Sequence, residues 1–265
     1  MTAPGATPVA AVPASAALAL PLHVRASILL RMLAIQGVWN YETMLGNGIA
    51  FSMEPALRRL PGGRKGAAYR TAMARHSGYF NAHPYFASVA VGALIRAELD
   101  GVPGEQIDRF RTAAPGPLGS VGDRLIWAGW LPLCSSIALL AYGLGASPLM
   151  VVLLFLGTYN CVHLGLRIWG LNAGLRQGLR MAHALGHPIL RQGPAYVASA
   201  TAFLAGVALP VAAHGIIGPG RVLLGSVLAA VAAGATLVTL LHGRFEGWRL
   251  ATLALASFVL YTMVR

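Results

Sequence analysis

The sequence predicts an all-α membrane protein that crosses the bilayer several times, and three observations support this fold class. Hydrophobic residues make up 56% of the 265 residues and charged residues only 11%, whereas ordinary soluble domains are about 25% charged. Several apolar runs are long enough to cross a bilayer as helices. The net charge is nevertheless +12, so we expect the positive charge to orient the chain or to contact a surface.

The same composition excludes three other classes of protein. A soluble single domain needs far more charge to cover its surface, and a nucleic-acid-binding protein this basic would be less apolar. The apolar content is also too high for a disordered chain, except at the ends. Cys134 and Cys161 lie in apolar runs and form neither a disulfide framework nor a zinc-binding spacing.

The first 24 residues are rich in Ala and Pro, and no basic residue precedes their apolar part. A signal peptide would have a basic start, and this composition is typical of disordered segments. We therefore predict a disordered cytoplasmic tail over residues 1–24 and a membrane domain over residues 25–265. Within that domain we expect amphipathic and re-entrant helices at 25–120 and transmembrane helices at 121–265.

Residues 25–53 are predicted to form one amphipathic helix with a polar stripe. The four stripe residues share one helix face by their i, i+4, i+7, i+11 spacing: Gln36, Asn40, Thr43 and Asn47. Trp39 lies beside the stripe, and Glu42 lies about 120° away from it. Amides beside an aromatic ring suit a sugar or another polar partner. The alternative is a helix lying on the membrane surface, whose amides face water.

The motif at residues 81–85 begins a short apolar run over residues 84–97. About 14 residues suit a re-entrant or interfacial element better than a full crossing. Pro84 fits the first helical position, and Asn81 or His83 the cap. Capping explains the Pro and the Asn but not the His. The alternative is a helix N-terminus that aims its free N–H groups at a polar ligand within the membrane.

The Gly-rich stretch at residues 116–123 immediately precedes the first long apolar run. It lacks the Gly-Lys-Ser/Thr ending of a nucleotide-binding loop, so nucleotide binding is not expected. We predict that Asp123 is the N-cap of the next helix, which carries Trp127. The stretch could also line a cavity as irregular backbone, and the two roles are compatible.

Five apolar runs near the C-terminus are each about 17–21 residues long, which is enough to span a bilayer, and none contains Asp, Glu or Lys. They are residues 125–142, 149–169, 194–213, 222–241 and 248–264. Residues 58–75 and 167–191 are basic without any acid, so both stretches are predicted to face the cytoplasm. This arrangement leaves the C-terminus outside. The basic stretches could also contact anionic lipid or an acidic soluble partner.

The second long run contains polar residues, of which Asn160 and His163 are functional candidates or interhelical hydrogen-bonding groups. A ridge of glycines at four-residue spacing follows and predicts close helix packing: Gly170, Gly174 and Gly178. His183 and His187 have a spacing that could bind a metal, but no carboxylate or Cys lies near them, so no metal site is expected. No catalytic set can be assembled from the sequence.

Four of these segments together resemble the IID component of mannose/fructose/sorbose-type sugar phosphotransferase systems. They occur in the family's order and near its spacing, and the resemblance extends over about residues 25–265. The segments are 36–42 (Gln-Gly-Val-Trp-Asn-Tyr-Glu), 79–85 (Tyr-Phe-Asn-Ala-His-Pro-Tyr), 116–123 (Gly-Pro-Leu-Gly-Ser-Val-Gly-Asp) and 160–171 (Asn-Cys-Val-His-Leu-Gly-Leu-Arg-Ile-Trp-Gly-Leu). The chain has Thr43, Ala82 and Arg124 where the family usually has Arg, Thr and Pro.

The resemblance implies a permease subunit that acts with a IIC subunit in the bacterial cytoplasmic membrane. The pair would carry a hexose of the mannose/fructose/sorbose type, and several such pairs would assemble. A separate IIB subunit would phosphorylate the sugar after receiving phosphate from IIA. No catalytic or phosphorylated residue and no cofactor is therefore expected in this chain. The alternative is a diverged scaffold or receptor that keeps the fold without transporting sugar.

Residues in or beside the matching motifs are the candidates for facing the sugar or the partner subunit. They are Gln36, Trp39, Asn40, Glu42, Asn81, His83, Asp123 and Asn160.

Overall fold

The computed structural model describes residues 20–180, 186, 188–217 and 220–241, and within these residues every regular element is a helix. The prediction of an all-α fold is therefore confirmed. In chain order the elements are α1 (Leu22–Leu33), α2 (Gly46–Leu57), η1 (Gly63–Lys65), α3 (Ala67–Ser77), α4 (Ala87–Leu99), α5 (Gly104–Ala113), α6 (Pro115–Gly122), η2 (Asp123–Trp130), α7 (Leu131–Gly143), α8 (Pro148–Gln177), η3 (Gly178–Arg180), α10 (Pro188–Ile217) and α11 (Arg221–Leu241).

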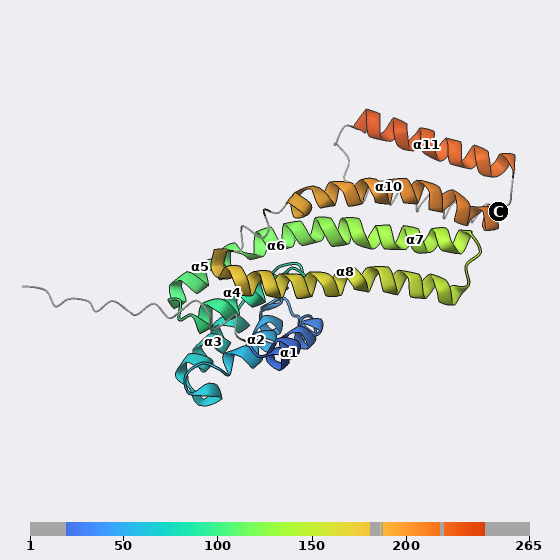
Figure 1. Ribbon diagram of the computed structural model, residues 1–265. Coiled ribbons are helices and arrows are strands. Elements are labelled where there is room, and N and C mark those ends of the chain that lie inside the picture. The colour runs from blue at the N-terminus through green and yellow to red at the C-terminus, as the bar shows by residue number, and fades with distance from the viewer. Residues whose placement is uncertain (1–19, 181–185, 187, 218–219, 242–265) are drawn as a thin grey trace, which may run out of the picture.

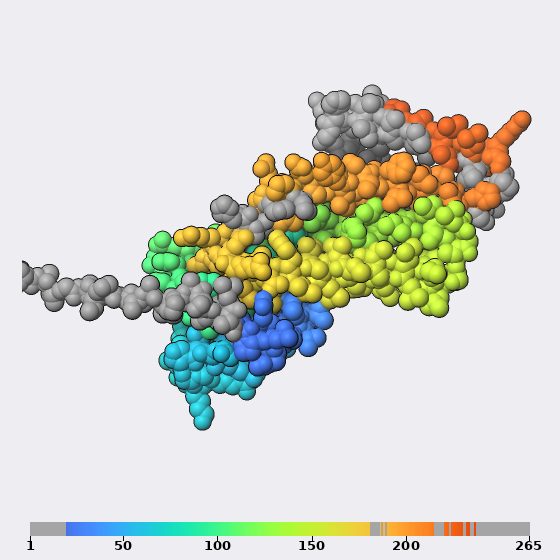
Figure 2. Space-filling view, in the orientation of Figure 1, coloured from blue at the N-terminus to red at the C-terminus, as the bar shows by residue number. Residues whose placement is uncertain are grey.

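The long helices form an elongated bundle in which α7 lies between α8 and α10 (Figure 1). Helix α11 lies along the outer side of α10. The smaller helices α1 to α4 are attached to the side of the bundle near the end where α8 finishes and α10 begins (Figure 2). At the opposite end Ser147 caps α8, because its side chain accepts a hydrogen bond from the amide of Met150 at 3.3 Å.

Three helical stretches are long and apolar enough to cross a membrane: Gly104–Gly143, Pro148–Arg180 and Leu190–His214. They contain the first three predicted spans. The fourth predicted span, residues 222–241, coincides with α11, and the fifth, residues 248–264, lies outside the described residues.

Helix α4 is the centre of the core, and it corresponds to the short apolar run predicted at residues 84–97. Its side chains are buried almost from end to end, and Val89, Leu94 and Ile95 are fully buried. It packs closely on α8 through glycines. A Cβ added at Gly174 would lie 2.2 Å from the carbonyl oxygen of Val89, and one at Gly92 would lie 2.4 Å from that of Leu171.

The single amphipathic helix predicted over residues 25–53 is wrong. The structure has two helices there, α1 and α2, separated by turns over residues 34–45. The side chain of Asn40 accepts hydrogen bonds from the amides of Glu42 and Thr43 at 3.0 and 2.9 Å, and such bonds compete with those of a helix. Met44 then takes a positive φ of 51°, which a continuing α-helix does not allow.

The predicted role of Asp123 as an N-cap is also wrong, because the helix begins well before it. Residues 116–123 are helical and belong mostly to α6, in which proline lies in the first turn. Proline is favoured there because the first amides of a helix have no intrahelical acceptor. The chain continues without interruption into η2 and α7, so Asp123 lies inside a long helix.

Candidate functional site

A cavity of about 410 Å³ lies where three separate segments of the chain meet. The lining comes from the turn after α1, the segment before α4, and the helix formed by α6 and η2. Its residues are Gln36, Trp39, Leu45, Asn81, Ala82, His83, Pro84, Pro115, Gly116, Gly119, Ser120, Asp123 and Trp127. Five of the eight candidates from the sequence therefore line one cavity: Gln36, Trp39, Asn81, His83 and Asp123.

Asn40 holds the turn that carries Trp39, and it does not line the cavity itself. Its side-chain oxygen accepts from the amides of Glu42 and Thr43, and its side-chain nitrogen donates to the hydroxyl of Thr43 at 2.9 Å. The same hydroxyl accepts from the side chain of Asn47 at 3.1 Å. Thr43, one of the departures from the family pattern, is thus the centre of a small hydrogen-bonded network. Glu42 is exposed on this turn.

Backbone hydrogen bonds tie this turn to the segment before α4. The amide of Leu45 donates to the carbonyl of Phe80 at 3.0 Å, and the amide of Phe80 donates to the carbonyl of Thr43 at 3.2 Å. The two bonds place Trp39 and Asn81 on the same cavity although they are far apart in the sequence.

His83 is held rigidly at the base of the cavity and is only 1% exposed. Its Nδ1 atom accepts a hydrogen bond from the amide of Tyr85 at 3.2 Å, so the neutral ring carries its proton on Nε2. Burial, and then the charges of Arg167 and His163, lower the pKa of His83 from 6.5 to about 4. Within the described residues the Nε2 atom is buried without a hydrogen-bond partner.

The helix opposite His83 can approach it closely because position 122 is a glycine. A Cβ at Gly122 would lie 2.2 Å from the Cβ of His83. The π-helical segment η2 begins directly after it, at Asp123, and such segments are often found at functional sites. On this helix Ser120, Asp123 and Trp127 follow i, i+3, i+7 spacing and therefore face the cavity together.

The cavity combines hydrogen-bonding groups with aromatic surfaces. Asp123 supplies acceptors, Gln36 and Asn81 supply both donors and acceptors, and Ser120 supplies a hydroxyl. Trp39 and Trp127 are 44% and 41% exposed as whole residues, and their indole rings offer surfaces on which a ligand can stack. This combination suits a polyhydroxylated molecule or a polar segment of a partner protein. Across the described residues no group of three His, Cys, Asp or Glu side chains could hold a metal ion.

Asn160 belongs to a second polar cluster and does not line the cavity. Its side-chain oxygen accepts from Nδ1 of His163 at 3.3 Å, and Nε2 of His163 accepts from Arg167 at 2.7 Å. Arg167 also donates to the carbonyl of Met32 and lies 5.1 Å from the centre of the Tyr85 ring. Arg167 was predicted among the basic residues facing the cytoplasm, yet it is buried between α1 and α8.

The predicted glycine ridge has two kinds of contact. Added Cβ atoms at Gly170 and Gly174 would lie 2.0 and 2.2 Å from Ser88 and Val89, so both glycines lie against α4. Gly178 instead ends α8 with a positive φ of 54°, a conformation that favours glycine.

Sequence reasoning missed Ser120 and Trp127 as cavity residues. Their helical spacing from Asp123 is the signal that could have identified them, but residues 116–123 were not expected to be a regular helix. The local sequence does not predict the hydrogen bond of Arg167, because its acceptor is the backbone carbonyl of Met32, 135 positions away.

Comparisons with known proteins agree with these motifs. The model of the family described as PTS system mannose/fructose/sorbose family IID component matches residues 22–203. The chain is 32% identical over 171 residues to the PTS system mannose-specific EIID component of Escherichia coli K12, covering 62% of this chain and 59% of that protein. It is 29% identical over 166 residues to the fructose permease IID component of Bacillus subtilis, covering 60% and 58%. The matched region thus spans about three-fifths of these relatives.

Two solved structures share the fold. One belongs to the cryoEM complex of the mannose transporter ManYZ with microcin E492, with a TM-score of 0.55, 23% identity, and coverage of 92% of this chain and 97% of that one. The other is described as a membrane protein, with a TM-score of 0.67, 22% identity, and coverage of 92% and 98%. At this level of identity they support the all-α membrane fold.

Proposed function

Since the chain belongs to the family of mannose/fructose/sorbose phosphotransferase IID components, we propose that it is one half of a sugar permease. In this proposal a IIC subunit is the other half, and the pair carries a hexose of the mannose/fructose/sorbose type across the bacterial cytoplasmic membrane. Soluble IIB and IIA subunits supply the phosphate, so this chain contributes no catalytic residue. Several IIC–IID pairs assemble, with the N-terminus of this chain in the cytoplasm and its C-terminus outside.

The cavity between the three motif segments is the observation that carries this proposal. Residues from positions 36, 81 and 123 come together although nothing in their local sequence requires it. A chain kept only as a membrane anchor has no need for an open cavity lined with amides, a carboxylate and two exposed indoles. These groups match the hydroxyl groups and the apolar ring faces of a hexose.

The surface of α8 supports a role inside a larger membrane assembly. Its exposed side chains are apolar over most of the helix, including Leu149, Leu153, Leu156, Leu164 and Trp169. Such a surface is stable only against lipid or another membrane helix. In the proposal, part of it packs on the IIC subunit.

The proposal is tested by sugar uptake in cells that express the chain together with its IIC, IIB and IIA partners. Asn81→Ala and Asp123→Ala remove cavity groups, and we expect lower uptake at unchanged membrane levels. Asp108→Ala is the matched control, because this carboxylate lies outside the cavity with 60% of its side chain exposed. Unchanged uptake in both cavity variants would contradict the proposal. A wild-type chain that co-purifies with IIC but supports no uptake would favour the non-transporting scaffold.

A further inference from the structure

A buried polar network joins helices α3, α4 and α5 beside the segment that leads to the cavity between the motif segments. Its members are His76 on α3, Glu98 on α4 and Arg111 on α5. His76 is fully buried, and Arg111 is only 8% exposed. Ionisable side chains are rarely buried this deeply unless specific partners satisfy them. The partners of each member therefore show what the network holds in place.

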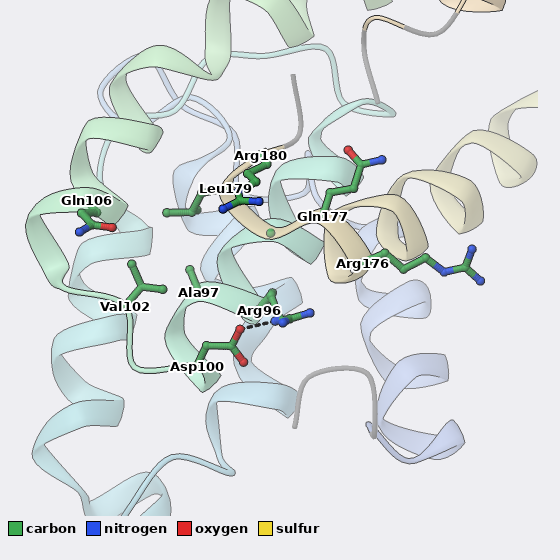
Figure 3. Close-up of a pocket in the computed structure, with 10 residues that line it drawn as sticks. Arg96, Ala97, Asp100, Val102, Gln106, Arg176, Gln177, Leu179 and Arg180 are labelled. Carbon is green, nitrogen blue, oxygen red and sulfur yellow. Dashed lines mark hydrogen bonds and ion pairs between the residues drawn. The ribbon is translucent and has the colours of Figure 1, made fainter. Parts of the chain in front are cut away.

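The network starts at the end of α4, which is fixed against α8. Arg96 donates to the carbonyl of Leu175 at 3.2 Å and pairs with Asp100, as Figure 3 shows. Glu98 lies on the last turn of the same helix, and its Oε1 atom is 2.8 Å from Nε2 of His76. The carboxylate of Glu98 is therefore held in place as an acceptor for His76.

His76 has one defined tautomer, because its two ring nitrogens have different partners. Its Nδ1 atom lies 3.2 Å from Nη1 of Arg111, and a guanidinium can only donate. Nδ1 is therefore the acceptor, and the ring proton lies on Nε2, where it is donated to Glu98. Burial lowers the pKa of His76, so the ring is neutral at neutral pH and Nδ1 can accept from Arg111.

Arg111 binds the backbone that precedes the cavity. Its Nη2 atom donates to the carbonyl of Gly78 at 2.9 Å and to that of Tyr79 at 3.3 Å. Its guanidinium also lies 5.8 Å from the centre of the Phe80 ring. Among the described residues Arg111 forms no ion pair with an acid. Its charge is thus directed to two consecutive carbonyls, and charge-assisted hydrogen bonds are roughly twice as strong as neutral ones.

The residue that follows these carbonyls connects two walls of the cavity. The backbone of Phe80 forms two hydrogen bonds with the turn at residues 43–45, and this turn also carries Trp39. Asn81 comes directly after Phe80, and both Trp39 and Asn81 line the cavity. The backbone that Arg111 fixes is therefore the one that places Asn81 relative to Trp39.

We propose that Arg111 is a positioning residue for the cavity. It does not line the cavity itself, and it acts by fixing the carbonyls of Gly78 and Tyr79. A ligand that bonds to Asn81 and stacks on Trp39 binds well only when both groups are held at the correct separation. This inference rests on the proposed function, since it concerns the same cavity.

The first test is hydrogen–deuterium exchange, measured by mass spectrometry on the purified full-length chain in detergent. In Arg111→Gln the amides of Leu45 and Phe80 should exchange about tenfold faster or more, because hydrogen bonds from a charged group are lost. Exchange in α8 should not change. Arg109→Gln is the matched control, because it removes the same charge from the same helix, where Arg109 forms an exposed pair with Glu105.

Unchanged exchange at Leu45 and Phe80 in Arg111→Gln would overturn the proposal. Equally faster exchange in α8 would also overturn it, because Arg111 would then stabilise the whole chain. Arg111→Lys keeps the charge but lacks the planar guanidinium that reaches three acceptors, so its exchange should lie between that of the wild type and Arg111→Gln. If Arg111→Gln does not fold, Arg111→Lys decides the test, and exchange equal to the wild type would overturn the proposal.

The second test measures uptake of mannose, fructose and sorbose in cells that also express the IIC, IIB and IIA partners. Arg111→Gln should raise the half-saturating concentration of the transported sugar by about two- to tenfold, the equivalent of one hydrogen bond. Arg109→Gln should match the wild type. An unchanged half-saturating concentration, despite faster exchange at Phe80, would overturn the link to the cavity. A wild-type chain that takes up none of the three sugars would contradict the proposed function, whereas the exchange measurement still decides whether Arg111 positions the segment.

Discussion

The imidazole of His83 accepts a hydrogen bond from the backbone amide of Tyr85 at 3.2 Å. Histidine thus does at this turn what Asn or Asp usually does at the start of a helix. The same bond fixes the proton on Nε2, which is buried without a hydrogen-bond partner among the described residues. His83 is therefore a cap for the segment leading into α4, and its neutral ring has one fixed tautomer.

This arrangement predicts that the chain becomes less stable below neutral pH. The pKa of His83 is lowered to about 4 from 6.5, so between these values the unfolded chain binds the proton and the folded chain does not. The contribution to stability is present above pH 6.5 and is lost as the pH falls towards 4. At about 1.4 kcal/mol per pKa unit its upper limit is about 3 kcal/mol.

The measurement is thermal unfolding in detergent between pH 4 and 7. His83→Asn keeps an acceptor for the amide of Tyr85 but cannot titrate, so its stability should depend less on pH. Burial also lowers the pKa of His76. His76 therefore accounts for the pH dependence of stability that remains in His83→Asn. An identical pH slope in wild type and His83→Asn would contradict the prediction.

Gly122→Ala is expected to destabilise the chain by about 1–3 kcal/mol, because overpacking forces neighbours to move. The new Cβ would lie 2.2 Å from the Cβ of His83. Gly119→Ala on the same helix is the control, since its nearest atom would be the Cα of Ala82 at 3.9 Å, an ordinary contact. The melting temperatures of the two variants should differ clearly, and equal melting temperatures would show that His83 moves aside at little cost.

The sequence was informative about the site because motif residues mark positions that the fold brings together. Gln36, Trp39, Asn81, His83 and Asp123 were selected because they lie in or beside the four motif segments that carry the family resemblance, and all five line the cavity. The long apolar runs also predicted the membrane helices, because length and hydropathy alone decide whether a segment can span a bilayer.

Local breaks in the helices could not be predicted in the same way. A polar stripe at helical spacing does not reveal that α1 ends at Leu33, or that the side chain of Asn40 bonds to the amides that follow it. Proline and glycine suggested a loop at residues 116–123, although both are compatible with the first turn and the close packing of a helix. Both errors arise where side-chain or tertiary contacts override the local pattern.

Glu54 is expected to be important for the stability of the N-terminal helices. Its side chain is only 8% exposed and forms ion pairs with Arg31, Arg58 and Arg64. Burial alone would raise its pKa, but hydrogen bonds from Arg58 and Arg64 outweigh burial and lower it to about 2. The resulting stabilisation is present above pH 4.5 and is lost as the pH falls towards 2.

Glu54→Gln should therefore cost about 1.5–3 kcal/mol at neutral pH, the usual contribution of hydrogen bonds to a charged group, because the carboxylate is buried while its arginine partners are partly exposed. Glu105→Gln is the control, because its pair with Arg109 is 76% exposed on both sides and should contribute less than about 1 kcal/mol. Unfolding at pH 7 measures both. Similar losses in the two variants would mean that the Glu54 network is as weak as a surface pair.

The packing of α8 on α4 predicts a sharp difference between two glycines of the same helix. A Cβ at Gly174 would lie 2.2 Å from the carbonyl oxygen of Val89 and 2.6 Å from the amide of Ala93. Backbone atoms cannot rotate away as a side chain can, so Gly174→Ala has to separate the helices. We expect a loss of stability of about 1–3 kcal/mol or more.

At Gly165 a Cβ would meet nothing within 4 Å, and alanine favours helix over glycine by about 1 kcal/mol. Gly165→Ala should therefore be neutral or slightly stabilising in the monomeric chain. Thermal unfolding of the purified variants compares them directly, and a Gly174→Ala protein as stable as Gly165→Ala would refute the close contact between α4 and α8.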